Sequence, residues 1–217
     1  KNMKKLRTNI RTVIQNISSL LLAACLLALM GGCEKRVDEY SDFFRTRFYY
    51  AFDEKVSLFT KENTLLVKYE GVVDTSEVRE FLETEASSNL KLWWHDTKTV
   101  EIKTGSKEIT IALKTKLVSL DEVYTCRPFY ILGNGLDMGV TDEILVQFLP
   151  EISEESKTEL FDTFETALIE TTKIYQLLRV KRGADALEIA NKIYETGLTE
   201  YSTPNFISYF EYGSASF

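Results

Sequence analysis

Short runs of aromatic and β-branched residues, separated by charged or glycine-containing stretches, fill the chain from residue 48 to residue 132. Runs of this kind are typical of β-strands. One segment differs, because Asp74 and Glu77 form a capping-box pattern before an apolar spacing that suits a short amphipathic helix. The predicted strands cover residues 48–52, 56–59, 64–69, 90–94, 99–102, 109–113 and 124–132, and the turn Gly133-Asn134-Gly135 follows the last of them.

From residue 143 onward the pattern alternates between strand and helix. Residues 143–149 place Ile144, Val146 and Phe148 on one face, which predicts a strand that ends at Pro150. Ser156 and Glu159 then form a capping box. The apolar stripe of the helix that follows consists of Leu160, Phe161, Phe164, Ala167 and Leu168.

The last third of the chain repeats this alternation. Residues 174–180 predict a strand, and Asp185 with Glu188 caps a second helix. Gly197 stands where the left-handed residue after a helix belongs, and an extended run continues through Phe206. This order of elements is typical of a split βαβ sheet with both helices on one face. The predicted fold class is therefore α+β, with a β-rich N-terminal domain at residues 48–140 and a sandwich at residues 141–217.

The first 32 residues have a different composition. They hold five basic residues and no acid, and an apolar run from Leu20 to Met30 leads to Gly31, Gly32 and Cys33. This pattern predicts a secretory signal, because the apolar run is shorter than the roughly 20 residues of a spanning helix. The ending resembles a bacterial lipoprotein signal, in which Cys33 becomes the acylated first residue; ordinary secretion with cleavage nearby is the alternative. Residues 33–47 are then expected to form a tether.

Charge and cysteine content narrow the possible partners. The net charge is −7, and removal of residues 1–32 makes it −12. So acidic a chain is not expected to bind nucleic acid by general electrostatic attraction. Attachment to a membrane would then depend on the lipid at Cys33, and Cys126 is left without a cysteine to pair with. The 217 residues, 44% of them apolar, suffice for one or two small domains, and no internal repeat is visible in the sequence.

No catalytic set is apparent. His95 is the only histidine and most simply a strand-end or turn residue, and no Gly-x-Ser-x-Gly pattern supplies a nucleophile for it. Cys126 is expected to be a small buried side chain. With one histidine and scattered acids, no metal or cofactor is predicted. The pairs Tyr49-Tyr50 and Trp93-Trp94 are either core residues or a platform for a glycan or peptide.

Residues 185–197, then Glu200-Tyr201 and Pro204-Asn205-Phe206, resemble the end of a subtilase prodomain, particularly of the fervidolysin-like type. Residues 142–148 are similar to the first strand of that family, so the resemblance covers residues 142–206. The whole chain is similar to the N-terminal regions of subtilase lipoproteins of Bacteroides-like bacteria. One departure is that only about a dozen residues separate Leu168 from Val180, which suggests a shortened hairpin between the two helices.

The resemblance implies a ferredoxin-like module that binds a subtilisin-like protease, assists its folding and occupies its cleft. Its sheet would dock on surface helices of the protease, and its C-terminal strand would enter the cleft by strand addition. The contact residues expected from this are Tyr201, Pro204, Phe206, Tyr209, Phe210 and Tyr212; a final edge strand and a frayed end are the alternative for this tail.

Two classes of function follow. The first is the prodomain region of a subtilisin-like serine endopeptidase, either in a precursor whose protease domain comes next or as an inhibitor and chaperone acting in trans. The second is a surface lipoprotein whose N-terminal unit binds glycan or protein without a protease partner. Neither class makes the chain itself an enzyme, and both place it in the bacterial cell envelope, lipid-anchored at the outer membrane.

Overall fold

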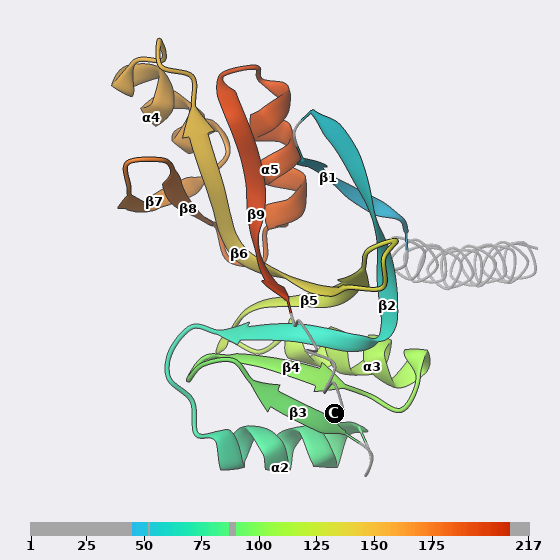
Figure 1. Cartoon of the computed structure of the whole chain (residues 1–217). Coiled ribbons are helices and arrows are strands. Elements are labelled where there is room, and N and C mark those ends of the chain that lie inside the picture. Colours follow the sequence, from blue (N-terminus) through green and yellow to red (C-terminus); the bar gives the residue numbers. More distant parts are fainter. Residues whose placement is uncertain (1–44, 52, 87–89, 209–217) are drawn as a thin grey trace, which may run out of the picture. The chain divides into compact units, whose positions relative to one another are not determined.

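The structure is a computed structural model that describes residues 45–51, 53–86 and 90–208, and all of them belong to one compact unit, Phe44–Phe217 (Figure 1). The described residues form nine strands and four helices. In chain order these are β1 Arg47–Ala51, β2 Glu54–Tyr69, α2 Thr75–Ala86, β3 Lys91–Trp94, β4 Thr99–Lys103, α3 Lys107–Leu117, β5 Val123–Ile131, β6 Asp137–Phe148, α4 Glu154–Thr163, β7 Thr166–Thr171, β8 Gln176–Val180, α5 Ala186–Glu195 and β9 Thr199–Ser208. The predicted α+β class is confirmed.

Two consecutive halves of this unit have the same topology. Residues 59–131, here called module 1, run β2-α2-β3-β4-α3-β5 with the strand order β3-β4-β2-β5. Residues 137–208, module 2, run β6-α4-β7-β8-α5-β9 with the order β7-β8-β6-β9. Every strand pair in both modules is antiparallel. Each module is therefore a complete βαββαβ, ferredoxin-like unit.

Module 1 differs from its prediction in one decisive element. Residues 109–113 were expected to be a strand because Ile109, Thr110 and Ile111 are β-branched, and this expectation is wrong. They lie in α3, whose N-terminal cap is Ser106; its side chain accepts from the backbone amide of Ile109. Thr110, Leu113 and Leu117 are buried at helical spacing, so packing overrides the strand propensity.

Three smaller predictions also change. The two strands expected at residues 56–59 and 64–69 are one strand, β2, because the charged residues between them form a bulge opposite β5 and not a turn. The first helix of module 2 is capped by Ser153 and ends at Thr163, with Glu165 at a positive φ of 49°. Ala167 and Leu168 consequently lie in β7, which forms a full hairpin with β8, so the hairpin expected to be shortened is present.

Other predicted signals are confirmed. Asp74 accepts from the backbone amides of Ser76 and Glu77 at the start of α2. Asp185 does the same for Leu187 and Glu188 at the start of α5. Gly197 follows α5 with a φ of 71°, a left-handed conformation that glycine adopts without strain.

The core lies between each sheet and its helices. In module 2 the buried side chains of β6 and β8 meet those of α5, and Ala190 and Ile193 are fully buried there. Burial of a leucine- or isoleucine-sized side chain contributes roughly 1.5–3 kcal/mol, so these contacts dominate the stability of the module. The core cluster also includes Leu58 of β2 and Tyr130 of β5. The domain boundary predicted between residues 140 and 141 falls inside β6, a strand that pairs with β5 at one end and with β8 at the other.

Candidate binding surface

The sheet of module 2 has one face that its helices do not cover. Ile144 and Val146 of β6 point to the helices and are fully buried. Because side chains alternate along a strand, Leu145 and Gln147 point the other way. The register places Leu145 beside Leu177 of β8 and Thr203 of β9.

This helix-free face carries apolar side chains that are only partly buried. Tyr201 of β9 stands opposite Gln147 of β6, and Tyr175 precedes β8 close enough to influence the ionisation of Tyr201. Partial burial, together with the nearby Tyr175 and Glu200, raises the pKa of the Tyr201 hydroxyl, which is therefore neutral at physiological pH. The residues that define the face are Leu145, Gln147, Tyr175, Leu177, Tyr201 and Thr203.

The structure separates the residues expected to contact a protease. Tyr201 lies on the helix-free face. Pro204 pairs with Ile144 and is buried on the opposite side, next to the core. Phe206 also faces the core, where its ring meets that of Tyr49 edge-to-face at a centroid distance of 5.0 Å. Tyr209, Phe210, Tyr212 and the expected lipid site Cys33 lie outside the described residues.

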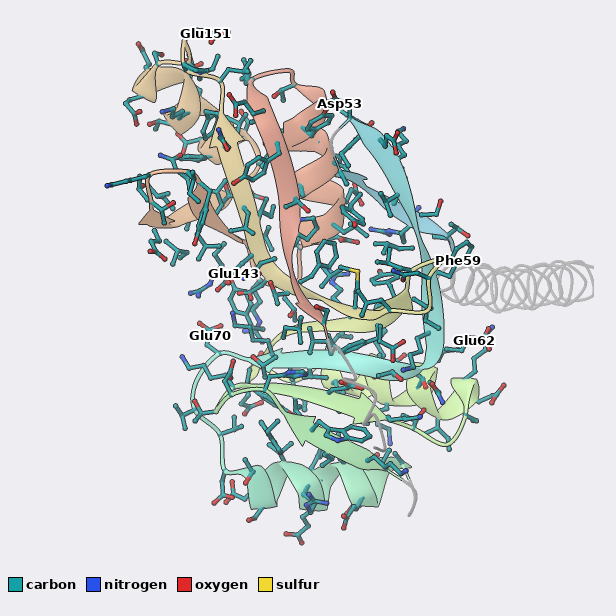
Figure 2. All side chains as sticks on the ribbon, viewed as in Figure 1. Asp53, Phe59, Glu62, Glu70, Glu143 and Glu151 are labelled. Atoms are coloured by element: carbon teal, nitrogen blue, oxygen red, sulfur yellow. The ribbon has the colours of Figure 1, made fainter. Side chains whose placement is uncertain are left out.

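A cluster of charged side chains borders this face where the two modules meet. Asp142 has a side chain with 0% exposure, and it forms ion pairs with Lys68 of module 1 and with Nε of Arg179, the latter at 3.2 Å. Glu143 contacts Lys68 at 3.6 Å and Arg179 at 3.3 Å. Figure 2 shows Glu143 near this junction, with Glu70 on the side of module 1. We call Lys68, Asp142, Glu143 and Arg179 the junction cluster.

The junction cluster also holds β9. Asn205 donates a hydrogen bond from its side-chain amide to Glu143 at 3.0 Å, and the hydroxyl of Thr141 donates to the Asn205 carbonyl at 2.8 Å. Burial alone would raise the pKa of Glu143, but the hydrogen bond from Asn205 and the charges of Lys68 and Arg179 outweigh it and hold the pKa below its usual value. Glu143 therefore stays ionised at neutral pH and keeps its contacts to both modules and to β9.

A cavity of about 280 Å³ opens beside the cluster, lined by Lys68, Asp142 and Arg179 and by residues of module 1 that include Asp96 and Lys98. Its lining balances acidic and basic groups. This cluster could not be predicted from the sequence, because Lys68 and Arg179 lie far from Asp142 and Glu143 in the chain. The only signal was the pair Asp142-Glu143 at the start of a strand that is otherwise apolar.

The other candidate residues are Cys126, His95 and the pair Trp93-Trp94, and their surroundings do not point to a catalytic role. Cys126 is buried, and burial raises the pKa of its thiol to about 12, which leaves no thiolate for nucleophilic attack. Burial lowers the pKa of His95, which lies 3.8 Å from Glu101. Trp94 stacks near Tyr69 in module 1, whereas Trp93 is 44% exposed.

Within residues 45–51, 53–86 and 90–208, no group of three or more His, Cys, Asp or Glu side chains is placed to hold a metal ion. None of the helices α2 to α5 is long and apolar enough to cross a membrane.

The described residues thus define an α+β protein of two ferredoxin-like modules, one of which presents a partly apolar sheet face. The sequence matches no protein-family model, and no curated protein matches it significantly. Among solved structures, the small subunit of acetolactate synthase from Thermotoga maritima aligns with 68% of this chain and 97% of its own, at 12% identity and a TM-score of 0.27. A similarity this low carries no argument about function.

Proposed function

We propose that the chain is a protease-directed binding module: the prodomain region of a secreted subtilisin-like serine protease, acting as folding chaperone and inhibitor in cis or in trans. The observation that carries the proposal is the helix-free face of module 2. It joins the two segments that resemble a subtilase prodomain, residues 142–148 and 199–206, in one antiparallel sheet in which β9 pairs directly with β6. In this proposal the face docks on the protease.

The chemistry of the face supports a protein partner. Leu145, Leu177 and Tyr201 supply adjacent apolar surface, while Gln147 and Thr203 supply hydrogen-bonding groups between them. Interfaces that form between separately folded proteins combine an apolar, aromatic centre with polar groups at its rim. The face is also built on strands, which hold the side chains in a fixed arrangement and reduce the entropy lost on binding.

The position of β9 supports the proposal that the C-terminal residues occupy the cleft of the protease. Its last described residue, Ser208, pairs with Met138, and residues 209–217 continue from there. Nine residues span up to about 30 Å when extended, enough to reach a cleft beside a docked sheet. In this proposal they enter the cleft by strand addition.

The test is inhibition of a panel of purified subtilisin-type proteases by residues 34–217, which include the whole compact unit. We expect at least one protease to be inhibited with a Kd on the order of micromolar or tighter. Leu145→Lys and Tyr201→Lys each place a charge on the docking face and should raise this Kd at least about tenfold. The control is Val118→Lys, because Val118 is 52% exposed on module 1.

Absence of both inhibition and assisted refolding across the panel would refute the proposal. Equal inhibition by all the variants would place the contact elsewhere on the chain and would refute the assignment of the face.

We further propose that the chain is delivered to the cell envelope and anchored at the outer membrane by lipid on Cys33. The support is the basic, apolar and Gly-Gly-Cys order of residues 1–33. One acyl chain of myristoyl length gives only marginal membrane binding, so stable attachment requires more than one chain on the cysteine. Anchoring would keep the module beside a protease exported to the same compartment.

A further inference from the structure

One face of the module 1 sheet carries an exposed tryptophan. Trp93 of β3 stands opposite Glu101 of β4 and is 44% exposed. Its chain neighbour Trp94 stands opposite Val100, which is fully buried, so Trp93 points to the other face of the sheet. A tryptophan side chain buries roughly 150–250 Å² when it is covered, so Trp93 keeps apolar area that a contact can remove from water.

Two lysines lie beside Trp93 on the same face. Lys91 of β3 stands opposite Lys103 of β4, two positions from the pair of Trp93 and Glu101. Like charges that stand directly opposite each other in a sheet repel, so an acidic group placed near both lysines is stabilised there. Leu66 of β2 completes the surface, because it is the other partner of Glu101. We call Leu66, Lys91, Trp93, Glu101 and Lys103 the Trp93 face.

Strand β9 ends beside the Trp93 face. A Cβ on Gly139 of β6 would lie 3.0 Å from the Leu66 side chain, so Gly139 turns toward this face. Ile207 of β9 pairs with Gly139, and residues paired across antiparallel strands point to the same side. Ile207 therefore also points to the Trp93 face, and Ser208, the last described residue, follows it. The chain after Ser208 accordingly starts at the Leu66 end of the face.

The segment that follows has the reach and the composition to cover this face. Trp93 lies two strands from Leu66, about 10 Å at the usual spacing between strands. The nine residues 209–217 span up to about 30 Å when extended. Three of their first four side chains are aromatic and the other is the only charged side chain of the segment, an acid; in order they are Tyr209, Phe210, Glu211 and Tyr212. This composition matches an exposed ring beside two lysines.

We infer that the Trp93 face binds residues 209–217 of the same chain, with their aromatic rings against Trp93. Glu211 then lies next to Lys91 and Lys103. The link through β9 holds the segment close to the face, which favours this intramolecular contact over one with a second copy or a separate partner. The inference concerns the chain without a protease and does not rest on the proposed function. It adds a requirement to that proposal, because the same residues have to leave the Trp93 face before they enter a cleft.

Acrylamide quenching of Trp93 fluorescence in residues 34–217 tests the inference. The variant Trp94→Phe leaves Trp93 as the only tryptophan of the chain. In this background, Phe210→Ser together with Tyr212→Ser should raise the quenching constant of Trp93 at least about twofold, because the rings that shield Trp93 are removed. The control is Val118→Ser, at a position of module 1 that is 52% exposed, and it should leave the constant unchanged.

A pair of cysteines tests which segment covers the face. Lys91→Cys combined with Glu211→Cys should form a disulfide within one chain under mild oxidation, with a yield that does not depend on protein concentration. Val118→Cys combined with Glu211→Cys is the matched control and should not form one. Cys126 is buried and does not interfere. This variant keeps both tryptophans, so its result is independent of the Trp94→Phe background.

Two outcomes would overturn the inference. The first is equal quenching of Trp93 with and without the two aromatic rings. The second is a disulfide that forms only between chains, which would assign the Trp93 face to the segment of a second copy. Neither experiment contains a protease, so a chain that inhibits none of the panel can still give the expected results.

Discussion

Asp142→Asn is the substitution that most directly probes how the two modules are held together. It keeps the shape of the side chain but removes a carboxylate with 0% exposure that pairs with Lys68 and Arg179. The two cations keep Glu143 as a partner, at 3.6 Å and 3.3 Å, so neither is left without an ion pair.

The expected loss of unfolding free energy follows from the length of the Asp142–Arg179 ion pair and from the exposure of the side chains that pair with Asp142. At 3.2 Å and an effective dielectric constant of about 20, one ion pair amounts to about 5 kcal/mol before desolvation is subtracted. Breaking a fully buried pair costs about 3–5 kcal/mol. Lys68 and Arg179 retain 19% and 38% exposure, so water compensates part of the loss. We expect the free energy of unfolding to fall by about 2–3 kcal/mol, which for a unit of this size lowers Tm by about 5–10 °C.

Urea and thermal unfolding of residues 34–217, followed by circular dichroism, measure this change. The control is Asp162→Asn, an exposed aspartate of α4, for which we expect a change within about 0.5 kcal/mol. A double-mutant cycle with Lys68→Met should give a coupling of at least about 1 kcal/mol. If Asp142→Asn is no more destabilising than the control, the junction cluster does not hold the modules together.

Three further results are expected. Glu143 has a lowered pKa in the folded state, so its contribution to stability is present above the unfolded pKa of 4.5 and is lost as the pH falls through the folded pKa. In urea titrations, the difference in the free energy of unfolding between wild type and Glu143→Gln should therefore shrink below about pH 4.5. Gly139→Ala would bring a Cβ to within 2.9 Å of the Phe129 ring and 3.0 Å of Leu66, and should lower the free energy of unfolding by about 1–3 kcal/mol; an unchanged midpoint would contradict the close approach. In cells, Cys33→Ala should move the protein out of the membrane fraction, and unchanged partitioning would defeat the proposed lipid anchor.

Local signals in the sequence predicted most of module 2, although they assigned Ala167 and Leu168 of β7 to the preceding helix. The caps at Asp185 and Gly197 and the alternation from Ile144 to Phe148 each depend on residues close in the chain, and the structure bears them out. Module 1 was harder because Ile109, Thr110 and Ile111 have a strong strand propensity. Residues 109–113 are nevertheless helical because Leu113 and Leu117, at helical spacing in the same segment, are buried against the sheet. That one error concealed the shared topology of the two modules.

The candidate site could be predicted only in part. Tyr201 was selected as a contact residue and lies on the helix-free face, but Pro204 and Phe206 alternate with it onto the core side. The bulge between Val140 and Ile144 in the pairing with β9 shifts the register there, and a bulge has no reliable signal in a single sequence. The junction cluster depends on contacts between residues more than 70 positions apart, such as Lys68 and Asp142.

The helix-free faces of the two modules have different surroundings. In module 1 the face turned away from the helices is buried in its middle, where Leu66 has 3% exposure and Glu101 has 7%, but Trp93, opposite Glu101 on β3, is 44% exposed. Gly139 of β6 approaches Leu66 there, and Arg127 of β5 reaches the backbone of Gly183 in module 2. That face is used to join the modules. The equivalent face of module 2 is not used to join the modules at Leu145, Leu177 and Tyr201, which are only partly buried, so these three neighbouring side chains have apolar area still to bury against a partner.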